Sequence, residues 1–284
     1  MRCLLVIPAF NESARLPAYL RALLAGLDRS GLDCNVLVVD DGSGADEVGY
    51  VDDLAEMLRP LHSRLLEPLC LGTNRGKGGA VRAGWDAAED YDWVGFVDAD
   101  GSISEREVVR LVALAATSQK PVTIFGSRIK MLGRRVERST LRHWSGRFFA
   151  FLVGRTVSAR VYDSQCGIKL LPISALRRIQ PWLRESGFCF DVEILAALEV
   201  VGLPILEVPI DWVDTPGTKV RLFRDTLRMA FALLRISHRR RSWMSLKAPT
   251  SLPTRPLVIG TIVPSSTSSS SASVPSAHSP PVAG

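Results

Sequence analysis

Short apolar runs alternate with segments of helical periodicity along the first half of this 284-residue chain. Leu4–Ile7, Val36–Val39 and Trp93–Val97 are continuous apolar runs of strand length. After each run, leucines or valines recur every three or four positions, as on the buried stripe of a helix. This alternation predicts an α/β fold whose mostly parallel sheet is covered by helices on both faces.

The same two patterns predict the other elements. Further strands are expected at Arg64–Cys70, Pro121–Phe125, Gly167–Leu171 and Ile205–Ile210. Helices are expected around Leu16–Leu27, Val51–Leu58, Ala80–Glu89, Ser104–Ala115, Ile173–Leu183, Asp191–Val201 and Leu222–Ile236. Ser104 and Glu107 have the spacing of a capping box, and Gly202 is expected to end its helix.

Composition divides the chain into three segments. Residues 1–215 hold the alternating pattern, residues 216–244 form a basic helical segment, and residues 245–284 are rich in serine and proline. A tail of that composition buries too little apolar surface to offset its ordering entropy, so we expect it to be disordered. No uninterrupted apolar stretch approaches the roughly 20 residues that cross a bilayer, so any membrane contact is expected to be peripheral.

Polar clusters follow three of the apolar runs, at Pro8–Glu12, Asp40–Ser43 and Asp98–Ser102. The carboxyl ends of parallel strands share one edge of a sheet, where ligands bind, so we expect the clusters to meet there. A carboxylate in the second cluster could accept the ring N–H of uracil or guanine. Asp41-Gly42-Ser43 is equally an ordinary turn signal.

Asp98 and Asp100 form the most informative pair in the sequence. Side chains two apart on a strand point the same way, so these carboxylates should project together and repel unless a cation lies between them. Mg²⁺ or Mn²⁺ is commonly held by one or two carboxylates together with phosphate oxygens. The pair therefore indicates a metal-assisted nucleotide-diphosphate site, although alone it also fits an Asp-rich turn that opens a helix.

A glycine-rich loop spans residues 72–79. It is not a P-loop, because Gly72 is one residue too close to Gly76-Lys77 and Gly78 replaces the required hydroxyl. It is not a dinucleotide-binding loop either, because it follows the third strand. Arg75 and Lys77 could contact a diphosphate or a sugar, with the glycines allowing close backbone approach.

Charge is unevenly distributed. Residues 1–100 carry 9 basic and 17 acidic side chains, whereas residues 128–160 carry 9 basic and one acidic side chain. Such a basic segment attracts phosphates of nucleic acid, lipid or nucleotide. Its aromatic residues, between Trp144 and Leu152, suit an amphipathic helix. We favour an anionic membrane surface over core packing for that helix.

The five cysteines are odd in number and include no C-x-x-C pair. They therefore suggest neither a zinc site nor a disulfide framework, and a reducing, cytoplasmic setting fits them. Together with the basic segment, this predicts a protein attached peripherally to the cytosolic face of a membrane.

Taken together, the motifs resemble glycosyltransferase family 2. The stretches that carry the resemblance are residues 7–12 (IPAFNE), 39–43 (VDDGS), 74–81 (NRGKGGAV), 98–101 (DADG) and 126–128 (GSR). Residues 162–170 (YDSQCGIKL), 190–193 (FDVE), 207–212 (EVPIDW) and 216–219 (PGTK) are similar to the dolichyl-phosphate β-glucosyltransferase branch. The resemblance implies a GT-A fold, a nucleotide-sugar donor, Mg²⁺ or Mn²⁺, and a polyprenyl-phosphate acceptor.

It also implies roles for individual residues. The residues expected to bind the donor are Pro8, Phe10, Glu12 and Asp41 at the base and ribose, Asp98 at the ribose or diphosphate, and Arg75, Lys77, Arg128, Lys219 and Arg221 as positive charges. Asp100 is the expected metal ligand, with Asp98 beside it. Asp191 and, less clearly, Asp163 are candidate bases, and each is equally suited to holding a neighbouring lysine or arginine.

The acceptor would need cations rather than a base. A phosphate monoester has a second pKa near ~6, so at neutral pH its oxygen is already an anion able to attack the anomeric carbon with inversion. The cations expected to hold it are Arg134, Arg135, Arg138, Arg142 and Lys169.

Other functions fit parts of the pattern. A GDP-mannose-dependent polyprenyl-phosphate mannosyltransferase, a transferase with a soluble sugar acceptor and a nucleotidyltransferase would each use the same strand ends. A non-enzymatic nucleic-acid-binding protein would use the basic segments alone; we expect no nucleic acid partner, because such a protein has no use for polar clusters at three strand ends. The oligomeric state is left open.

Overall fold

The computed structural model describes residues 1–118, 122–137, 153–154, 157, 161–215 and 222–246. The expected tail is outside this range except for its first two residues, and the whole of the aromatic helix expected between Trp144 and Leu152 is outside it. Four residues with expected roles, Arg138, Arg142, Lys219 and Arg221, also lie outside the described residues.

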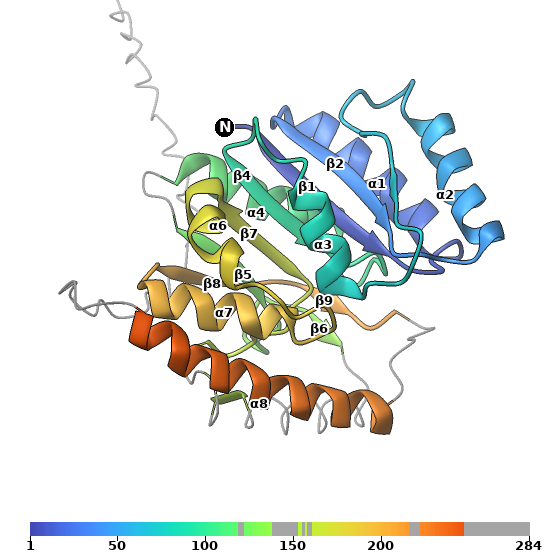
Figure 1. The fold of residues 1–284 in the computed structure, drawn as a ribbon. Helices are drawn as coiled ribbons and strands as arrows, with labels where there is room; N and C mark the ends of the chain where they lie inside the picture. The colour runs from blue at the N-terminus through green and yellow to red at the C-terminus, as the bar shows by residue number, and fades with distance from the viewer. Residues whose placement is uncertain (119–121, 138–152, 155–156, 158–160, 216–221, 247–284) are drawn as a thin grey trace, which may run out of the picture.

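A seven-stranded sheet in the order β3-β2-β1-β4-β7-β5-β8 forms the centre of the molecule (Figure 1). The strands are β1 (Cys3–Ala9), β2 (Cys34–Asp40), β3 (Leu69–Cys70), β4 (Trp93–Val97), β5 (Thr123–Ser127), β7 (Ile168–Pro172) and β8 (Ile205–Pro209). Only β7 runs antiparallel to its neighbours in this sheet, β4 and β5. The expected mostly parallel sheet is thus confirmed. A separate pair joins β6 (Val136–Glu137) to β9 (Trp212–Val213).

Helices cover both faces of the sheet, as the apolar strands predicted. Leu5 and Ile7 pack in one apolar cluster with residues of α1 (Leu16–Ser30), α2 (Ala45–Leu58) and α4 (Glu105–Thr117). Leu4 and Val6 pack in the other with residues of α3 (Lys77–Trp85), α6 (Ile173–Ile179) and α7 (Phe190–Val201). This division follows the two-residue period of a strand.

The last described helix, α8 (Leu222–Leu246), lies alongside α7 on its outer side (Figure 1). It runs ten residues beyond the expected end at Ile236. Its Ala232, Leu233, Ile236 and Trp243 are buried in the same apolar cluster as α7. No helix in the described ranges combines the length and apolar character that crossing a membrane requires.

Several element boundaries differ from expectation. The strand expected at Arg64–Cys70 shortens to Leu69–Cys70 at the sheet edge, preceded by Pro68, which cannot donate to a ladder. The helix expected at residues 80–89 is α3, which starts at Lys77 and ends at Trp85. The helix expected at residues 173–183 breaks into α6 and a 3₁₀ turn at Gln180–Trp182.

The prediction of a capping box at Ser104 and Glu107 is wrong. Ser104 occupies the N-cap position of α4 but makes no side-chain cap hydrogen bond. The Glu107 side chain instead pairs with Arg110 and lies 3.1 Å from Arg134 Nη1. Two arginines therefore compete with the helix end for this carboxylate. Gly202 does end α7, in the left-handed conformation expected of it.

Candidate functional site

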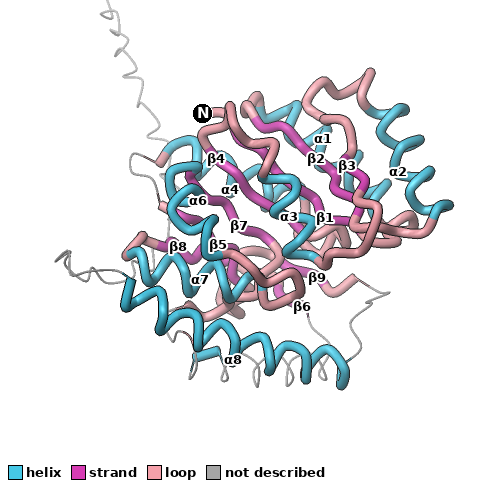
Figure 2. Tube along the Cα trace, viewed as in Figure 1, coloured by secondary structure: helices cyan, strands magenta, loops and turns pink. Residues whose placement is uncertain are grey.

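The three polar strand ends meet at one edge of the sheet, as expected. β2, β1 and β4 are adjacent and parallel, with Ala9 paired to Asp40, and Figure 2 shows them side by side. The clusters also bond directly: Asn11 N donates to Ser43 Oγ at 2.8 Å, and Asp41 N donates to Ala9 O at 2.8 Å. The candidate site is built on this edge.

Asp41 lies at the centre of the second cluster. Its buried carboxylate accepts the backbone N–H of Arg75 at 2.7 Å, which joins the end of β2 to the glycine-rich loop. Burial raises the pKa of Asp41, against the opposing effect of the amides of Arg75 and Gly76. A side chain at Gly42 would collide with the backbone of Thr73, so the turn itself is packed against the loop.

The residues of the first cluster lie on the same edge. Pro8 is inside β1, opposite Val39, and Phe10 follows the strand with 38% of its surface exposed. Glu12 is held by Arg15, whose Nε lies 2.7 Å from Oε2. An exposed ring beside buried carboxylates suits a planar base, which is the role expected for Phe10.

Asp98 and Asp100 extend from the end of β4. Asp98 Oδ1 lies 2.8 Å from Lys77 Nζ, and its side chain is 38% exposed. Asp100 Oδ1 accepts the amide of Ser102 at 2.9 Å. Partial burial raises the pKa of Asp98; Lys77 opposes this shift and the negative charge of Asp100 adds to it. The negative charge of Asp100 thus acts against the ionisation of Asp98.

Lys77 begins a line of alternating charges that runs into the sheet. Its Nζ is 3.1 Å from Asp191 Oδ2, and the other oxygen of Asp191 pairs with Lys169. Burial alone would raise the pKa of Asp191, but Lys169 and Lys77 outweigh it and hold that pKa below its ordinary value. Asp191 was expected to act either as a base or as the partner of a neighbouring lysine or arginine. Its contacts with Lys77 and Lys169 match the second role.

Lys169 differs from expectation. It is 0% exposed, its Nζ donates to Cys166 O at 3.0 Å, and it lies 5.4 and 4.8 Å from the ring centres of Phe96 and Phe125. A lysine in that position does not reach the surface where an acceptor phosphate would arrive. Its place on β7, between β4 and β5, explains the burial.

Arg128, which is partly buried, and the buried Asp163 form a second ion pair. Asp163 accepts Nε and Nη2 of Arg128 at 2.6 and 2.7 Å, and its backbone N–H at 3.0 Å. Burial would lower the pKa of Arg128, but Asp163 outweighs it and raises that pKa. Asp163 thus holds an arginine, which is one of the two roles left open for it.

Glu207, to which the sequence assigned no role, supports this pair from β8. Its buried carboxylate accepts Ser127 Oγ at 2.7 Å and the amides of Asp163 and Tyr162 at 2.8 and 2.9 Å. An acid inside an apolar strand was the signal that could have revealed it, since such a group is buried only with several donors.

The two described acceptor-side arginines lie beyond β5. Arg134 Nη1 is 3.1 Å from Glu107 Oε1 and 3.8 Å from Asp211 Oδ1. The amide of Arg135 donates to Asp211 Oδ1 at 2.9 Å. Both are tied to the segment that carries β9.

The glycine-rich loop contacts this chain's own backbone. Gly78 N donates to Ser186 O at 2.7 Å, and a Cβ at Gly76 or Gly78 would meet the carbonyl oxygens of Ser186 or Glu185 at 2.4 or 2.6 Å. The close approach that the glycines predicted is therefore made to residues 185–187. Arg75 and Lys77 remain beside Asp41 and Asp98.

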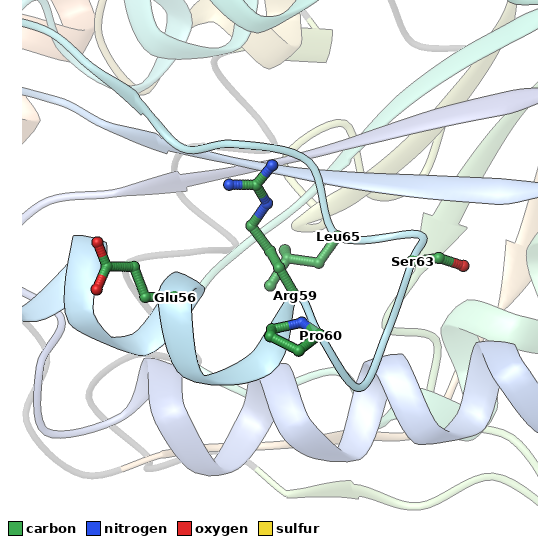
Figure 3. Close-up of a pocket in the computed structure, with 5 residues that line it drawn as sticks. All are labelled: Glu56, Arg59, Pro60, Ser63 and Leu65. Atoms are coloured by element: carbon green, nitrogen blue, oxygen red, sulfur yellow. The ribbon is translucent and has the colours of Figure 1, made fainter.

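The chemistry of Asp98 and Asp100 fits a metal that arrives with a nucleotide. In the described ranges no three histidine, cysteine or acidic side chains gather as a metal site. Mg²⁺ usually takes only one or two carboxylates when substrate phosphates supply further oxygens, which this pair can satisfy. The pocket in Figure 3 is elsewhere, at the end of α2, lined by Glu56, Arg59, Pro60, Ser63 and Leu65.

Known structures share this fold. Glucosyl-3-phosphoglycerate synthase from Mycobacterium tuberculosis, in complex with Mn²⁺, uridine diphosphate and phosphoglyceric acid, superposes with a TM-score of 0.61 at 16% identity, over 84% of this chain and 78% of that one. Mannosyl-3-phosphoglycerate synthase from Rubrobacter xylanophilus gives 0.61 at 17% identity, over 88% and 77%. The GT-A fold is thereby confirmed.

Other proteins are more similar to this chain in sequence than these two structures are. The chain is 31% identical to dolichyl-phosphate β-glucosyltransferase of Saccharomyces cerevisiae, over 79% of this chain and 71% of that protein. It is 32% identical to the mouse (Mus musculus) enzyme of the same name, over 81% and 72%. The model of glycosyl transferase family 2 matches residues 4–179. With its fold and its strand-end clusters, this chain belongs to glycosyl transferase family 2.

Proposed function

We propose that this enzyme transfers glucose from UDP-glucose to the phosphate of a polyprenyl lipid of the dolichyl type, with inversion at the anomeric carbon. The observation that carries the proposal is the similarity to dolichyl-phosphate β-glucosyltransferases over about four-fifths of the chain. The clustering of Asp41, Asp98 and Asp100 at one sheet edge supports it, because a nucleotide sugar needs both base recognition and diphosphate neutralisation there.

In this proposal the donor lies across the ends of β1, β2 and β4. Pro8, Phe10, Glu12 and Asp41 bind the base and ribose. Asp100, with Asp98, would hold Mg²⁺ or Mn²⁺, which would supply positive charge beside the diphosphate. Further positive charge comes from Arg75, Lys77, Arg128, Lys219 and Arg221.

The acceptor is activated by its own charge. A lipid phosphate is ionised at neutral pH and can attack without a strong base. The ion pairs of Asp191 and Asp163 support this, because a carboxylate held by cations is a poor proton acceptor. The cations proposed to position the acceptor are Arg134, Arg135, Arg138 and Arg142.

We also propose peripheral attachment to the cytosolic face of a membrane, through the outer face of α8. Phe231 and Leu234 on that face are 63% and 61% exposed. Arg228, His238 and Arg241, which are exposed, accompany them, and the helix carries no acidic residue after Asp225. Apolar side chains flanked by arginines suit the surface of an anionic bilayer.

A donor panel tests the transfer. The purified chain is incubated with UDP-glucose, GDP-mannose or UDP-N-acetylglucosamine and a polyprenyl phosphate, with and without EDTA, and the lipid is extracted. Labelled lipid is expected from UDP-glucose and only without EDTA. If only GDP-mannose labels the lipid, the donor sugar is mannose and not glucose. If label is transferred only to soluble sugars, the proposal of a lipid acceptor is wrong.

Vesicle flotation tests the attachment. The chain should float with vesicles that contain anionic lipid, and the double variant Phe231→Ser, Leu234→Ser should float far less. Met57→Ser is the matched control, because Met57 is a similarly exposed apolar residue on α2. Equal flotation of all three proteins would contradict the assignment to α8.

A further inference from the structure

Two buried carboxylates join α8 to the segment beside the glycine-rich loop. Glu185 accepts Nε and Nη2 of Arg235 at 3.1 and 2.8 Å, and Nη2 of Arg239 at 2.5 Å. Glu193, on the first turn of α7, accepts the same Arg239 nitrogen at 2.8 Å. One guanidinium therefore bridges two acids that would otherwise repel each other.

Glu193 also fixes the backbone of this segment. Its Oε2 accepts the amides of Arg184 and Glu185 at 2.8 and 2.7 Å. Both acids are buried, and a buried carboxylate is tolerated only when it is paired and hydrogen-bonded. The position of residues 184–187 thus depends on the arginines of α8.

The other side of the segment holds the start of α3. Ser186 O accepts the amide of Gly78 at 2.7 Å, and a side chain at Gly76 or Gly78 would collide with the carbonyl oxygen of Ser186 or Glu185. Lys77 lies between these two glycines, and its Nζ is 2.8 Å from Asp98. A shift of residues 184–187 would therefore carry Lys77 away from Asp98.

We propose that Arg239, assisted by Arg235, is a positioning residue for the sugar-nucleotide site: it anchors residues 184–187, which fix the start of α3 and place Lys77 beside Asp98. The part of this proposal that concerns the donor rests on the proposed function, since it takes Asp98 and Asp100 as the place of the diphosphate. The part that concerns the start of α3 does not.

Amide hydrogen exchange of the full-length chain, without lipid or nucleotide, tests the mechanical link. In Arg239→Gln the amides of residues 77–80 should exchange about tenfold faster or more, because the bond from Gly78 to Ser186 opens more often. Amides of β1 and β2 should keep their protection. Arg177→Gln, which removes the same charge from an exposed position on α6, is the control and should change neither.

Donor binding tests the consequence. Titration calorimetry with UDP-glucose and Mg²⁺ should give a dissociation constant raised about tenfold in Arg239→Gln and unchanged in Arg177→Gln. Arg239→Lys should recover binding only in part, because an ammonium is more strongly hydrated than a guanidinium and is costlier to hold beside the buried Glu185 and Glu193. In turnover assays the loss should appear mainly in the donor KM.

Each outcome decides the proposal. Unchanged exchange at residues 77–80 in Arg239→Gln would overturn it, and so would an equal change in Arg177→Gln. If Arg239→Gln does not fold, Glu185→Gln removes the same bridge from the other side, and its exchange at residues 77–80 decides in the same way. If the wild-type chain binds no UDP-glucose, the proposed function fails while the exchange result still judges the link to α3.

Discussion

Replacing Lys169 by methionine should destabilise the protein strongly, because it leaves Asp191 buried with one cation fewer. Removing one partner of a buried ion pair costs about 3–5 kcal/mol. Asp191 keeps Lys77 at 3.1 Å, so we expect the lower end, about 3 kcal/mol. Methionine is unbranched like lysine and fills a similar volume, so a cavity adds little to this value.

Thermal denaturation at pH 7 measures the effect. In a domain of this size each kcal/mol shifts Tm by about 2–4 °C, so Lys169→Met should melt roughly 6–12 °C below the wild type. Lys130→Met is the matched control, because Lys130 is exposed. A surface change of this kind stays within about 0.5 kcal/mol, or roughly 1–2 °C.

The same variant separates the two roles considered for Lys169. If it holds Asp191, stability falls for the isolated protein. If it instead contacted the acceptor, the variant would raise the acceptor KM and keep its Tm. A Lys169→Met melting point within the range of Lys130→Met would refute the reasoning from burial.

Three further predictions follow from the contacts. Asp100→Asn should abolish metal-dependent turnover while the Tm stays near that of the wild type. Near-normal turnover in the purified variant would show that Asp100 is not the metal ligand. Gly167→Ala should weaken donor binding about tenfold or more, because a Cβ there would lie 2.2 Å from Asp98 Oδ2; calorimetric titration that gives the wild-type affinity would contradict this. Arg235 and Arg239 outweigh the effect of burial and hold the pKa of Glu185 below its ordinary value of 4.5. The ionised carboxylate therefore stabilises the fold above pH 4.5, and this stabilisation is lost as the pH falls through the lower pKa of the folded state. The difference in Tm between wild type and Glu185→Gln should therefore stay constant down to about pH 4.5 and shrink as the pH falls further, whereas a difference that does not change below pH 4.5 would argue against the ion pairs.

Local pattern was sufficient for the central strands and their ends. The runs at Leu4–Ile7, Val36–Val39 and Trp93–Val97 are apolar on both faces, and the structure buries both faces. The three strand ends meet because parallel strands of one sheet must share an edge, which is a property of topology and not of any particular side chain.

Contacts between residues far apart in the sequence could not be predicted from the local sequence pattern. An extended segment was expected near Gly167–Leu171, but nothing in its residues reveals that β7 inserts antiparallel between β4 and β5. That insertion buries Lys169 and brings Gly167 against Asp98. A lysine inside an apolar strand was a sign of burial, but its acid partner Asp191 comes 22 residues later and its pairing depends on the packing of α7.

The ion pairs at the edge also distinguish the two carboxylates of the D-x-D stretch. Lys169, Asp191, Lys77 and Asp98 alternate in sign and balance one another. Within the described part of the chain, the ion pairs place a lysine on Asp98 and no cationic side chain on Asp100, which accepts an amide instead. Of the two D-x-D carboxylates, Asp100 is therefore the one whose charge no described lysine or arginine side chain pairs with. A divalent ion that arrived with a diphosphate would gain most by meeting the charge of Asp100, since binding to Asp98 would mean competing with Lys77. Asp100→Asn therefore tests metal binding more sharply than Asp98→Asn does. The first variant removes only the carboxylate charge of Asp100, whereas the second also frees Lys77 from its ion pair.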